Sequence, residues 1–532
     1  MRRHNFVAIL LAGALALSCT YAGAQKKPKP PKERPDVAAF RARVEAKLAD
    51  ERVDKGRWGV LVVDAATGQK LYALNDQRYF TPASNTKLYT TVLAFAALGP
   101  DFRFRTTVET SGRIDSYGRL VGDLLLVGRG DPDLTNRKLP YTKEEDREGP
   151  PEKVLVELAD AVVARGIKQM EGDIVGDDSY FPYERYPAGW AISDMTPGFG
   201  APVSALTVND NVLNIEVHPG EREGDPAWYS VEPWADFYQF VNEIRTAQPP
   251  AEPGAGGIRL FREPGSRRVV MRGTIAPGSQ PRKLTLAVEE PAEYWAAVFK
   301  RLLETRGVRI YGTSRAVHGA LPAVETSAKP MKQEMIREPM TVLAEHISPP
   351  LPDAVRVVNK VSQNLHAELL LRAVAKEKTG DGSLSAALRY ENEFLKSIGM
   401  PDREVELNDG SGLARTNLVT PRATVLLLQW AEQQPWYDLF FPTLPIMGED
   451  GTLTDRLKNT PAAGRIHAKT GTLNSTNAVS GYATTVHGTK LIFSMYGNAH
   501  NLRGRDAAAV LDTICVAMVE ELGVPSPKKR KR

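Results

Sequence analysis

The sequence Ser84-Asn85-Thr86-Lys87 opens an apolar stretch whose spacing predicts a helix over residues 84–98. On such a helix Ser84 and Lys87 are neighbours on one face, because they lie three residues apart. A serine hydroxyl needs a base to become a nucleophile, and a lysine serves when burial and a second cation lower its pKa towards neutrality. The simpler interpretation is an N-cap serine beside a solvated lysine, so the rest of the sequence has to decide between the two.

Two later motifs favour the catalytic interpretation. Ser362-Gln363-Asn364 and Lys469-Thr470-Gly471-Thr472 follow in order, and the three motifs match the Ser-x-x-Lys, Ser-x-Asn and Lys-Thr-Gly set of penicillin-recognising serine enzymes. Lys469 lies between strand-like runs, which predicts a position on a sheet edge facing a cleft. We expect the backbone N–H groups of Ser84 and Thr472 to stabilise an oxyanion there.

Each motif is weak alone, because each occurs a second time. Ser526 and Lys529 repeat the first motif in a charged tail, and Ser475-Thr476-Asn477 repeats the second. Lys378-Thr379-Gly380 repeats the third, but it directly follows a helical pattern, so Gly380 is interpreted as a helix C-cap. Order and context therefore single out Ser84, Ser362 and Lys469.

The chain resembles the D-alanyl-D-alanine carboxypeptidase/endopeptidase family, the class C low-molecular-mass penicillin-binding proteins. The resemblance implies an α/β fold: a β-lactamase/transpeptidase-like domain, in which helices flank an antiparallel sheet, with two nested inserted mixed-β domains. Beyond the three motifs, the resemblance is carried by Gly122-Asp123-Leu124, Gly128-Arg129-Gly130-Asp131-Pro132, Ala205-Leu206-Thr207-Val208-Asn209-Asp210-Asn211 and Asp409-Gly410-Ser411-Gly412-Leu413.

The interval between Ser84 and Ser362 is far longer than a compact β-lactamase would need, and inserted domains would occupy it. We assign residues 37–107 and 339–524 to the penicillin-binding domain and residues 108–338 to the insertion. The inner inserted domain is expected near residues 132–206.

The resemblance implies that peptidoglycan stem peptides are cleaved through an acyl-enzyme on Ser84, with Lys87 as the base. Ser362 would relay a proton to the leaving amine, and Asn364 would hold the substrate amide. Lys469, with Thr470 in the Lys-Thr-Gly-Thr strand, would bind a substrate carboxylate. β-Lactam antibiotics would then be inhibitors.

A second pocket is implied for the zwitterionic end of a diaminopimelate side chain. Asp194 would bind its ammonium group and Arg415 its carboxylate, in keeping with the preference of each charge for the opposite one. Phe199 and Leu473 would form the walls around the apolar stem. The substrate-binding set is therefore Thr470, Gly471, Thr472, Asp194, Phe199, Arg415 and Leu473.

Two alternatives stay open. A serine β-lactamase would share the acylation step but needs an efficient deacylating base, and no glutamate is placed by a motif for that role. A catalytically silent wall-binding or β-lactam-sensing protein would use the motifs only to shape a groove. Intact Ser84 and Lys87 argue against the silent protein.

The composition excludes several classes of protein. The chain has 532 residues, of which 42% are hydrophobic and 25% charged, which suits several globular cores and not a disordered chain. A formal net charge of +4 does not call for a nucleic-acid partner. The two cysteines, Cys19 and Cys515, cannot build a disulfide framework or a zinc cluster. We expect no metal and no cofactor.

The two ends carry most of the positive charge. Residues 1–24 have the charged start, the apolar run and the Ala22-Gly23-Ala24 site of a secretory signal peptide, which predicts a periplasmic protein. Residues 25–36 read as a Lys/Pro linker and residues 525–532 as a basic tail. The body between them is acidic, so peripheral contact with an anionic membrane or wall would come from the ends.

Overall fold

The computed structural model describes residues 33–144, 146–248, 257–321 and 339–523. The predicted signal peptide at 1–24, most of the linker at 25–36 and the basic tail at 525–532 lie outside the described residues. Among the described residues, no helix combines the length and the apolar character that crossing a membrane requires.

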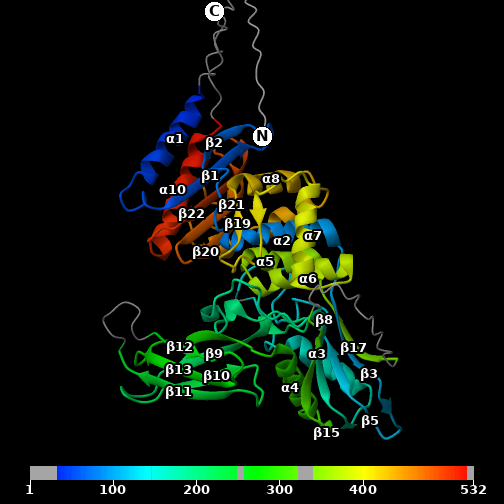
Figure 1. Ribbon diagram of the computed structural model, residues 1–532. Helices are drawn as coiled ribbons and strands as arrows, with labels where there is room; N and C mark the ends of the chain where they lie inside the picture. Colours follow the sequence, from blue (N-terminus) through cyan, green and yellow to red (C-terminus); the bar gives the residue numbers. More distant parts are fainter. Residues whose placement is uncertain (1–32, 145, 249–256, 322–338, 524–532) are drawn as a thin grey trace, which may run out of the picture.

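A five-stranded antiparallel sheet forms the frame of the first domain, in the order β2-β1-β22-β21-β20. Neighbouring residues of β1 point to opposite faces: Val60 and Val62 belong to one buried cluster, whereas Leu61 and Val63 belong to another. Helices α1 and α10 cover the first face, and α2 and α8 pack on the second (Figure 1). The strands are β1 (Arg57–Asp64), β2 (Lys70–Leu74), β20 (Ile466–Leu473), β21 (Thr476–Thr484) and β22 (Lys490–Asn498).

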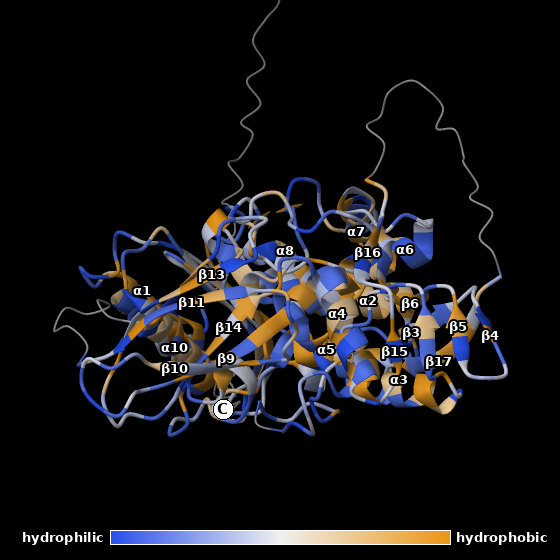
Figure 2. Ribbon diagram, turned by 90° about the horizontal axis from the view of Figure 1, so that it is seen from below, coloured by the Kyte–Doolittle hydropathy of each residue, from blue (hydrophilic) through white to orange (hydrophobic). Residues whose placement is uncertain are grey.

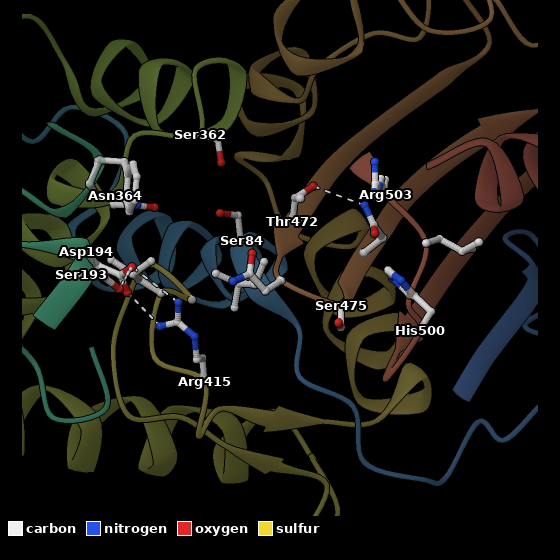
Figure 3. Close-up of a pocket in the computed structure, with 17 residues that line it drawn as sticks. Ser84, Ser193, Asp194, Ser362, Asn364, Arg415, Thr472, Ser475, His500 and Arg503 are labelled. Atoms are coloured by element: carbon white, nitrogen blue, oxygen red, sulfur yellow. Dashed lines mark hydrogen bonds and ion pairs between the residues drawn. The ribbon is translucent and has the colours of Figure 1, made fainter. Parts of the chain in front are cut away.

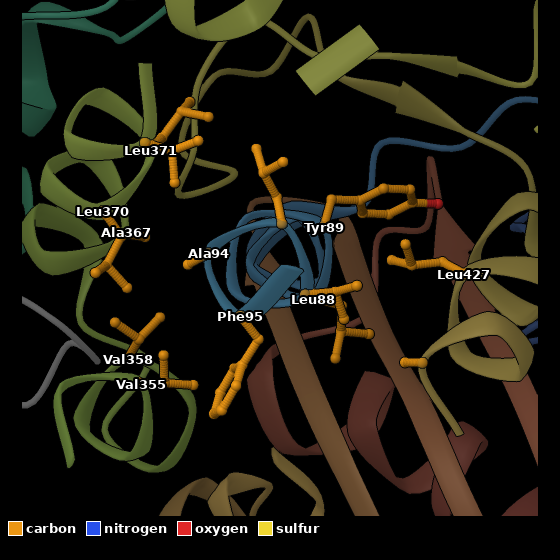
Figure 4. Close-up of a cluster of buried hydrophobic side chains, with 14 of the residues drawn as sticks. Leu88, Tyr89, Ala94, Phe95, Val355, Val358, Ala367, Leu370, Leu371 and Leu427 are labelled. Carbon is orange, nitrogen blue, oxygen red and sulfur yellow. The ribbon is translucent and has the colours of Figure 1, made fainter. Parts of the chain in front are cut away.

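Helix α2 (Thr86–Leu98) runs through the middle of the helical layer. Every residue from Thr86 to Phe95 is buried, because helices α5, α6, α7 and α8 all contact α2 (Figure 4). A helix that is enclosed on all sides holds its first turn rigidly, and that turn carries Lys87. The surrounding helices are α5 (Leu351–Lys360), α6 (Asn364–Thr379), α7 (Leu384–Ser397), α8 (Pro421–Glu432) and the short α9 (Tyr437–Phe440); strands β18 (Val405–Glu406) and β19 (Leu418–Val419) form a small ribbon beside them.

Helix α1 (Pro35–Leu48) was not predicted, and it begins inside the expected linker. Proline is tolerated at the first helical position, so Pro35 starts the helix instead of prolonging the extended segment. Val37, Phe40 and Val44 bury one face of α1 against the domain. Helix α10 (Gly504–Glu521) contacts α1, and its Cys515 is buried.

The insertion leaves and re-enters the first domain through one antiparallel pair of strands, β3 (Arg105–Thr110) and β17 (Thr341–Ile347). This pair belongs to a five-stranded sheet, β16-β8-β6-β3-β17, which lies near a four-stranded sheet, β15-β7-β5-β4. The remaining elements of this unit are β4 (Arg113–Ile114), β5 (Arg119–Val121), β6 (Leu124–Val127), α3 (Lys153–Ala164), β7 (Gln169–Glu171), β8 (Ile174–Pro182), α4 (Pro291–Glu304), β15 (Arg309–Ile310) and β16 (Ser314–Gly319).

The inner unit lies at residues 212–287 and not at the expected 132–206. The strands between 132 and 206 pair outside that range, since β7 pairs with β5 and β15, and β8 pairs with β6 and β16. Six later strands form the sheets β10-β9-β14 and β11-β13-β12, which take no strand from residues 132–206. An isolated bridge joins Leu286 of β14 to Pro197. In Figures 1 and 2 the two sheets lie away from α3 and β17. The six strands are β9 (Val212–His218), β10 (Trp228–Glu232), β11 (Gln239–Thr246), β12 (Arg259–Phe261), β13 (Arg268–Ile275) and β14 (Arg282–Ala287).

Candidate active site

Ser84 lies in a single 3-10 turn, Ala83–Asn85, that leads into α2. The Nζ atom of Lys87 lies 2.9 Å from Ser84 Oγ. The same Nζ donates to Asn364 Oδ1 and to the carbonyl oxygen of Ser411, both at 2.6 Å. The helix therefore brings the predicted nucleophile and the predicted base together, one turn apart, as their spacing implied.

The electrostatic setting of Lys87 suits a base. Its side chain is fully buried, and burial lowers the pKa of the ammonium group to about 7, although the nearby carboxylates of Asp409 and Glu368 raise it in part. A neutral amine has two N–H groups and one lone pair. Because Asn364 Oδ1 and the Ser411 carbonyl can only accept, they take the two N–H groups, and the lone pair is left for the Ser84 hydroxyl.

A second lysine faces a second serine in the same way. Lys469, on the edge strand β20, is fully buried and donates to Ser362 Oγ at 2.8 Å and to the carbonyl of Thr470 at 2.9 Å. Burial, and then the charge of Lys87, lower the pKa of Lys469 well below its usual value. The expected effect was that a second cation lowers the pKa of Lys87, but burial alone lowers it, and the charge of Lys87 acts on Lys469 instead.

Ser362 has a backbone φ of 66°, which is uncommon for a residue with a side chain. It joins the end of α5 to the start of α6, where the Gln363 side chain caps the helix by accepting the Leu365 N–H at 3.0 Å. A residue keeps such an unfavourable backbone conformation where the surrounding structure holds it in place. Here the turn aims Ser362 Oγ at Lys469.

Strand β20 passes directly against the turn that carries Ser84. A Cβ atom added to Gly471 would lie 2.6 Å from the Pro82 carbonyl oxygen and 3.0 Å from the backbone nitrogen of Ser84. The Asn85 side chain donates to the Lys469 carbonyl at 3.0 Å and holds the two segments together. Glycine is therefore the residue that allows this approach, and it brings Thr472 close to Ser84.

Two buried carboxylates that the sequence reasoning missed hold the loop behind Lys87. Asp409 accepts from Trp190 Nε1 at 2.9 Å, from the backbone N–H of Gly412 at 2.8 Å and from that of Ala414 at 2.7 Å. Glu368, one turn after Asn364 on α6, accepts from the backbone N–H of Ser411 at 2.8 Å. The motif around Asp409 was a visible signal, whereas Glu368 had none, because its burial depends on how α6 packs.

Most of the predicted residues line one cavity of about 840 Å³ (Figure 3). Lys87 and Lys469 lie buried behind its wall. Thr470 and Gly471 do not line it either, and Thr470 Oγ1 lies 2.7 Å from Thr452 Oγ1. The cavity is lined by the predicted residues Ser84, Asp194, Phe199, Ser362, Asn364, Arg415, Thr472 and Leu473, and by Ser193, Gly412, Leu413, Asn474, Ser475, Asn477, His500, Leu502 and Arg503, which were not predicted.

At one end of the cavity Asp194 and Arg415 are paired with each other. Arg415 Nη1 donates to Asp194 Oδ2 at 2.8 Å. The Asp194 side chain is buried, whereas that of Arg415 is 41% exposed. An incoming ammonium and carboxylate would therefore find both partners adjacent, with the guanidinium accessible from the cavity.

Comparison with known proteins identifies the family. The model of the D-Ala-D-Ala carboxypeptidase 3 (S13) family matches residues 40–518. A D-alanyl-D-alanine carboxypeptidase from Actinomadura sp. (strain R39) is 33% identical over 503 residues, which cover 92% of this chain and 86% of that protein. The D-alanyl-D-alanine carboxypeptidase DacB of Haemophilus influenzae is 28% identical over 83% of this chain and 85% of its own length.

A solved structure agrees with the sequence matches. Penicillin binding protein 4 from Haemophilus influenzae superposes with a TM-score of 0.74 and 26% identity, over 90% of this chain and 98% of its own. A transpeptidase-like domain with inserted sheets is thus common to both. With the three motifs assembled around Ser84, the chain belongs to the D-Ala-D-Ala carboxypeptidase 3 (S13) family.

Proposed function

We propose that this protein is a serine-type D-Ala-D-Ala carboxypeptidase and DD-endopeptidase that cleaves peptidoglycan stem peptides and their cross-links. The observation that carries the proposal is the buried Lys87, whose Nζ lies 2.9 Å from Ser84 Oγ and whose pKa burial lowers to about 7. A lysine in this state can accept the serine proton near neutral pH. The chemistry is acyl transfer through an ester on Ser84.

In the acylation step Ser84 Oγ attacks the carbonyl carbon of a D-alanine residue while Lys87 takes its proton. The oxyanion is stabilised by the backbone N–H groups of Ser84 and Thr472, which the close approach at Gly471 brings together. When the C–N bond breaks, Ser362 relays a proton to the leaving amine. Lys469, which donates to Ser362 Oγ, orients that hydroxyl.

Water completes the reaction by attacking the ester, and the acyl-enzyme returns to free Ser84 and a shortened peptide. The same two steps serve both activities. The leaving amine is free D-alanine in the carboxypeptidase reaction, whereas it belongs to a second stem peptide in the endopeptidase reaction. A β-lactam enters the same site, since its ring carbonyl acylates Ser84 in place of the peptide.

Substrate recognition divides between the two sides of Ser84. Asn364 holds the substrate amide. To do so, its Nδ2 gives up the hydrogen bond that it donates to the Phe199 carbonyl at 2.8 Å and turns to the substrate. Lys469, together with Thr470, binds a substrate carboxylate. Asp194 and Arg415 bind the zwitterionic end of a diaminopimelate side chain, between the walls made by Phe199 and Leu473.

We also propose that the protein acts in the periplasm. Residues 1–24 support export, and cleavage after Ala24 would leave a mature chain whose single cysteine is Cys515. The lysine- and arginine-rich ends would hold the enzyme at an anionic membrane or wall surface. Removing both ends should abolish such binding at low salt and leave penicillin labelling intact.

A fluorescent penicillin distinguishes the proposal from its alternatives. Label that persists on the mature protein and disappears in Ser84→Ala supports the penicillin-binding peptidase. Rapid turnover of the drug would identify a β-lactamase, and the absence of label would point to a silent protein. Product masses from purified cross-linked and pentapeptide wall fragments then test the endopeptidase and carboxypeptidase activities separately.

A further inference from the structure

The sheet β10-β9-β14 of the inner unit has one face in the core and one face away from it. Leu213, Ile215 and Val217 of β9 are buried in a hydrophobic cluster. The alternating residues point to the other side. There the strand register places Trp228 opposite His218, Ser230 and Lys283 opposite Glu216, and Glu232 and Thr285 opposite Asn214. We call these eight side chains the polar face.

The polar face is hollowed, and its cavity adjoins the active-site cavity through a third cavity. Part of it lines a cavity of about 750 Å³ together with Glu144 and Arg147. A smaller cavity of about 340 Å³ shares Arg147 and Thr285 with that cavity. The smaller cavity also shares Phe199, Ser362 and Asn364 with the cavity that contains Ser84. A polymeric ligand bound at Ser84 would therefore meet a row of adjoining cavities that ends on the polar face, beside His218 and Trp228, which line none of the three.

An exposed aromatic ring lies on the polar face, two residues along β10 from Ser230. Trp228 is 55% exposed. One side of its ring stacks on His218, with ring centroids 3.6 Å apart and planes 3° from parallel. His218 is held in turn by Glu216, since Nε2 and Oε1 are 3.2 Å apart. Trp228 thus presents a rigid, flat apolar surface, the shape on which the C–H face of a sugar ring packs.

The charges of this region favour an uncharged polar ligand. Glu216 and Glu232 alternate with Lys283, and Arg147 is paired with Glu144. A polyanion such as a nucleic acid would require a surface of one positive sign. Interleaved donors and acceptors suit hydroxyl and amide groups instead. An antiparallel sheet ordinarily exposes one polar face to solvent. Exposure alone does not account for cavities on this face that adjoin the cavity containing Ser84.

We propose that the polar face binds the amino-sugar strand of peptidoglycan while the attached stem peptide reaches Ser84. This inference rests on the proposed function. The glycan would pack a sugar ring on Trp228 and hydrogen-bond with Glu216, Lys283 and their neighbours. The inner unit would then select peptides that are still attached to glycan over free peptides.

Binding is measured first without catalysis. Isothermal titration calorimetry of the mature Ser84→Ala protein with soluble N-acetylglucosamine oligomers should show saturable binding, and Trp228→Ala should weaken it by about fivefold or more. Phe261→Ala is the matched control, because Phe261 is 47% exposed in the same inner unit but belongs to the other sheet. Absence of binding, or an equal loss in Phe261→Ala, would overturn the proposal.

Catalysis supplies the second test. With active protein, Trp228→Ala should lower kcat/KM for cross-links in glycan-attached fragments and leave kcat/KM for free cross-linked peptides unchanged. An equal loss on both substrates would overturn the glycan site. If the unmodified protein cleaves neither substrate, the proposed function fails, and calorimetry with the oligomers still decides the glycan site independently. The thermal unfolding midpoint of each variant shows that it is folded.

Discussion

The protonation of Lys87 predicts how acylation depends on pH. Burial lowers the pKa of this lysine from its usual 10.5 to about 7. At pH 7 about half of the protein then carries the neutral amine, against roughly one molecule in three thousand for an ordinary lysine. This difference in pKa means that the buried site disfavours the charged form of Lys87, relative to the neutral form, by about 5 kcal/mol. Because only the neutral amine accepts the Ser84 proton, acylation should rise with pH and level off above neutrality.

The assay is the second-order rate constant for acylation by a fluorescent penicillin, measured by stopped flow from pH 5 to pH 9. The rate should have its midpoint near pH 7 and be roughly a hundredfold lower at pH 5 than on the plateau. Lys87→Arg should remove almost all acylation and the pH dependence, since a guanidinium stays protonated. A flat profile, or a rate that still climbs tenfold per unit at pH 9, would refute the reasoning.

A second group near Lys87 could produce the same midpoint and needs its own control. Burial, with the charge of Asp409, raises the pKa of Glu368 to about 7 as well. Glu368→Gln keeps an oxygen that can accept the Ser411 N–H, so the loop should stay in place. If Lys87 is the titrating base, Glu368→Gln retains a pH-dependent rate. Loss of the pH dependence in this variant would assign it to Glu368.

Three further predictions concern the strand, the pocket and the core. Gly471→Ala should lower acylation by about a hundredfold in stopped flow, because its Cβ would push Thr472 away from Ser84; an unchanged rate would contradict the oxyanion role. Arg415→Ala should lower kcat/KM about tenfold for stem peptides with a free diaminopimelate carboxylate and leave peptides lacking that carboxylate unchanged; equal losses would argue against the pocket. Phe95→Ala should cost about 3–5 kcal/mol in denaturant unfolding, because its ring packs against Trp436 and Phe440 in the core; a loss below about 1 kcal/mol would contradict that packing.

The sequence predicted which residues meet at the site better than it predicted the architecture around them. Ser84 and Lys87 are close because they share one helical turn, which is a local property. Likewise, Gly380 ends α6 in the left-handed conformation that its C-cap interpretation required. The hairpin of β1 and β2 is a local feature as well, since the short turn between the strands fixes their pairing.

The misplaced inner unit shows where local reasoning fails. Strand β8 pairs in parallel with β16, which follows it by more than a hundred residues, and no pattern within either strand specifies that partner. Glu368 was missed for a related reason. A glutamate on a helix is ordinarily solvated, and only the packing of α6 against α2 and the 409–414 loop buries it. Pairing and burial of this kind are set by the whole fold.

The mass of the intact protein after exposure to benzylpenicillin tests the central claim most directly. We predict that the mature chain gains the mass of one penicillin, that peptide mapping places the adduct on Ser84, and that Ser84→Ala gains nothing. A protein that gains no mass while the drug stays intact, or one whose adduct maps to a residue other than Ser84, would contradict the assignment of Ser84 as the nucleophile.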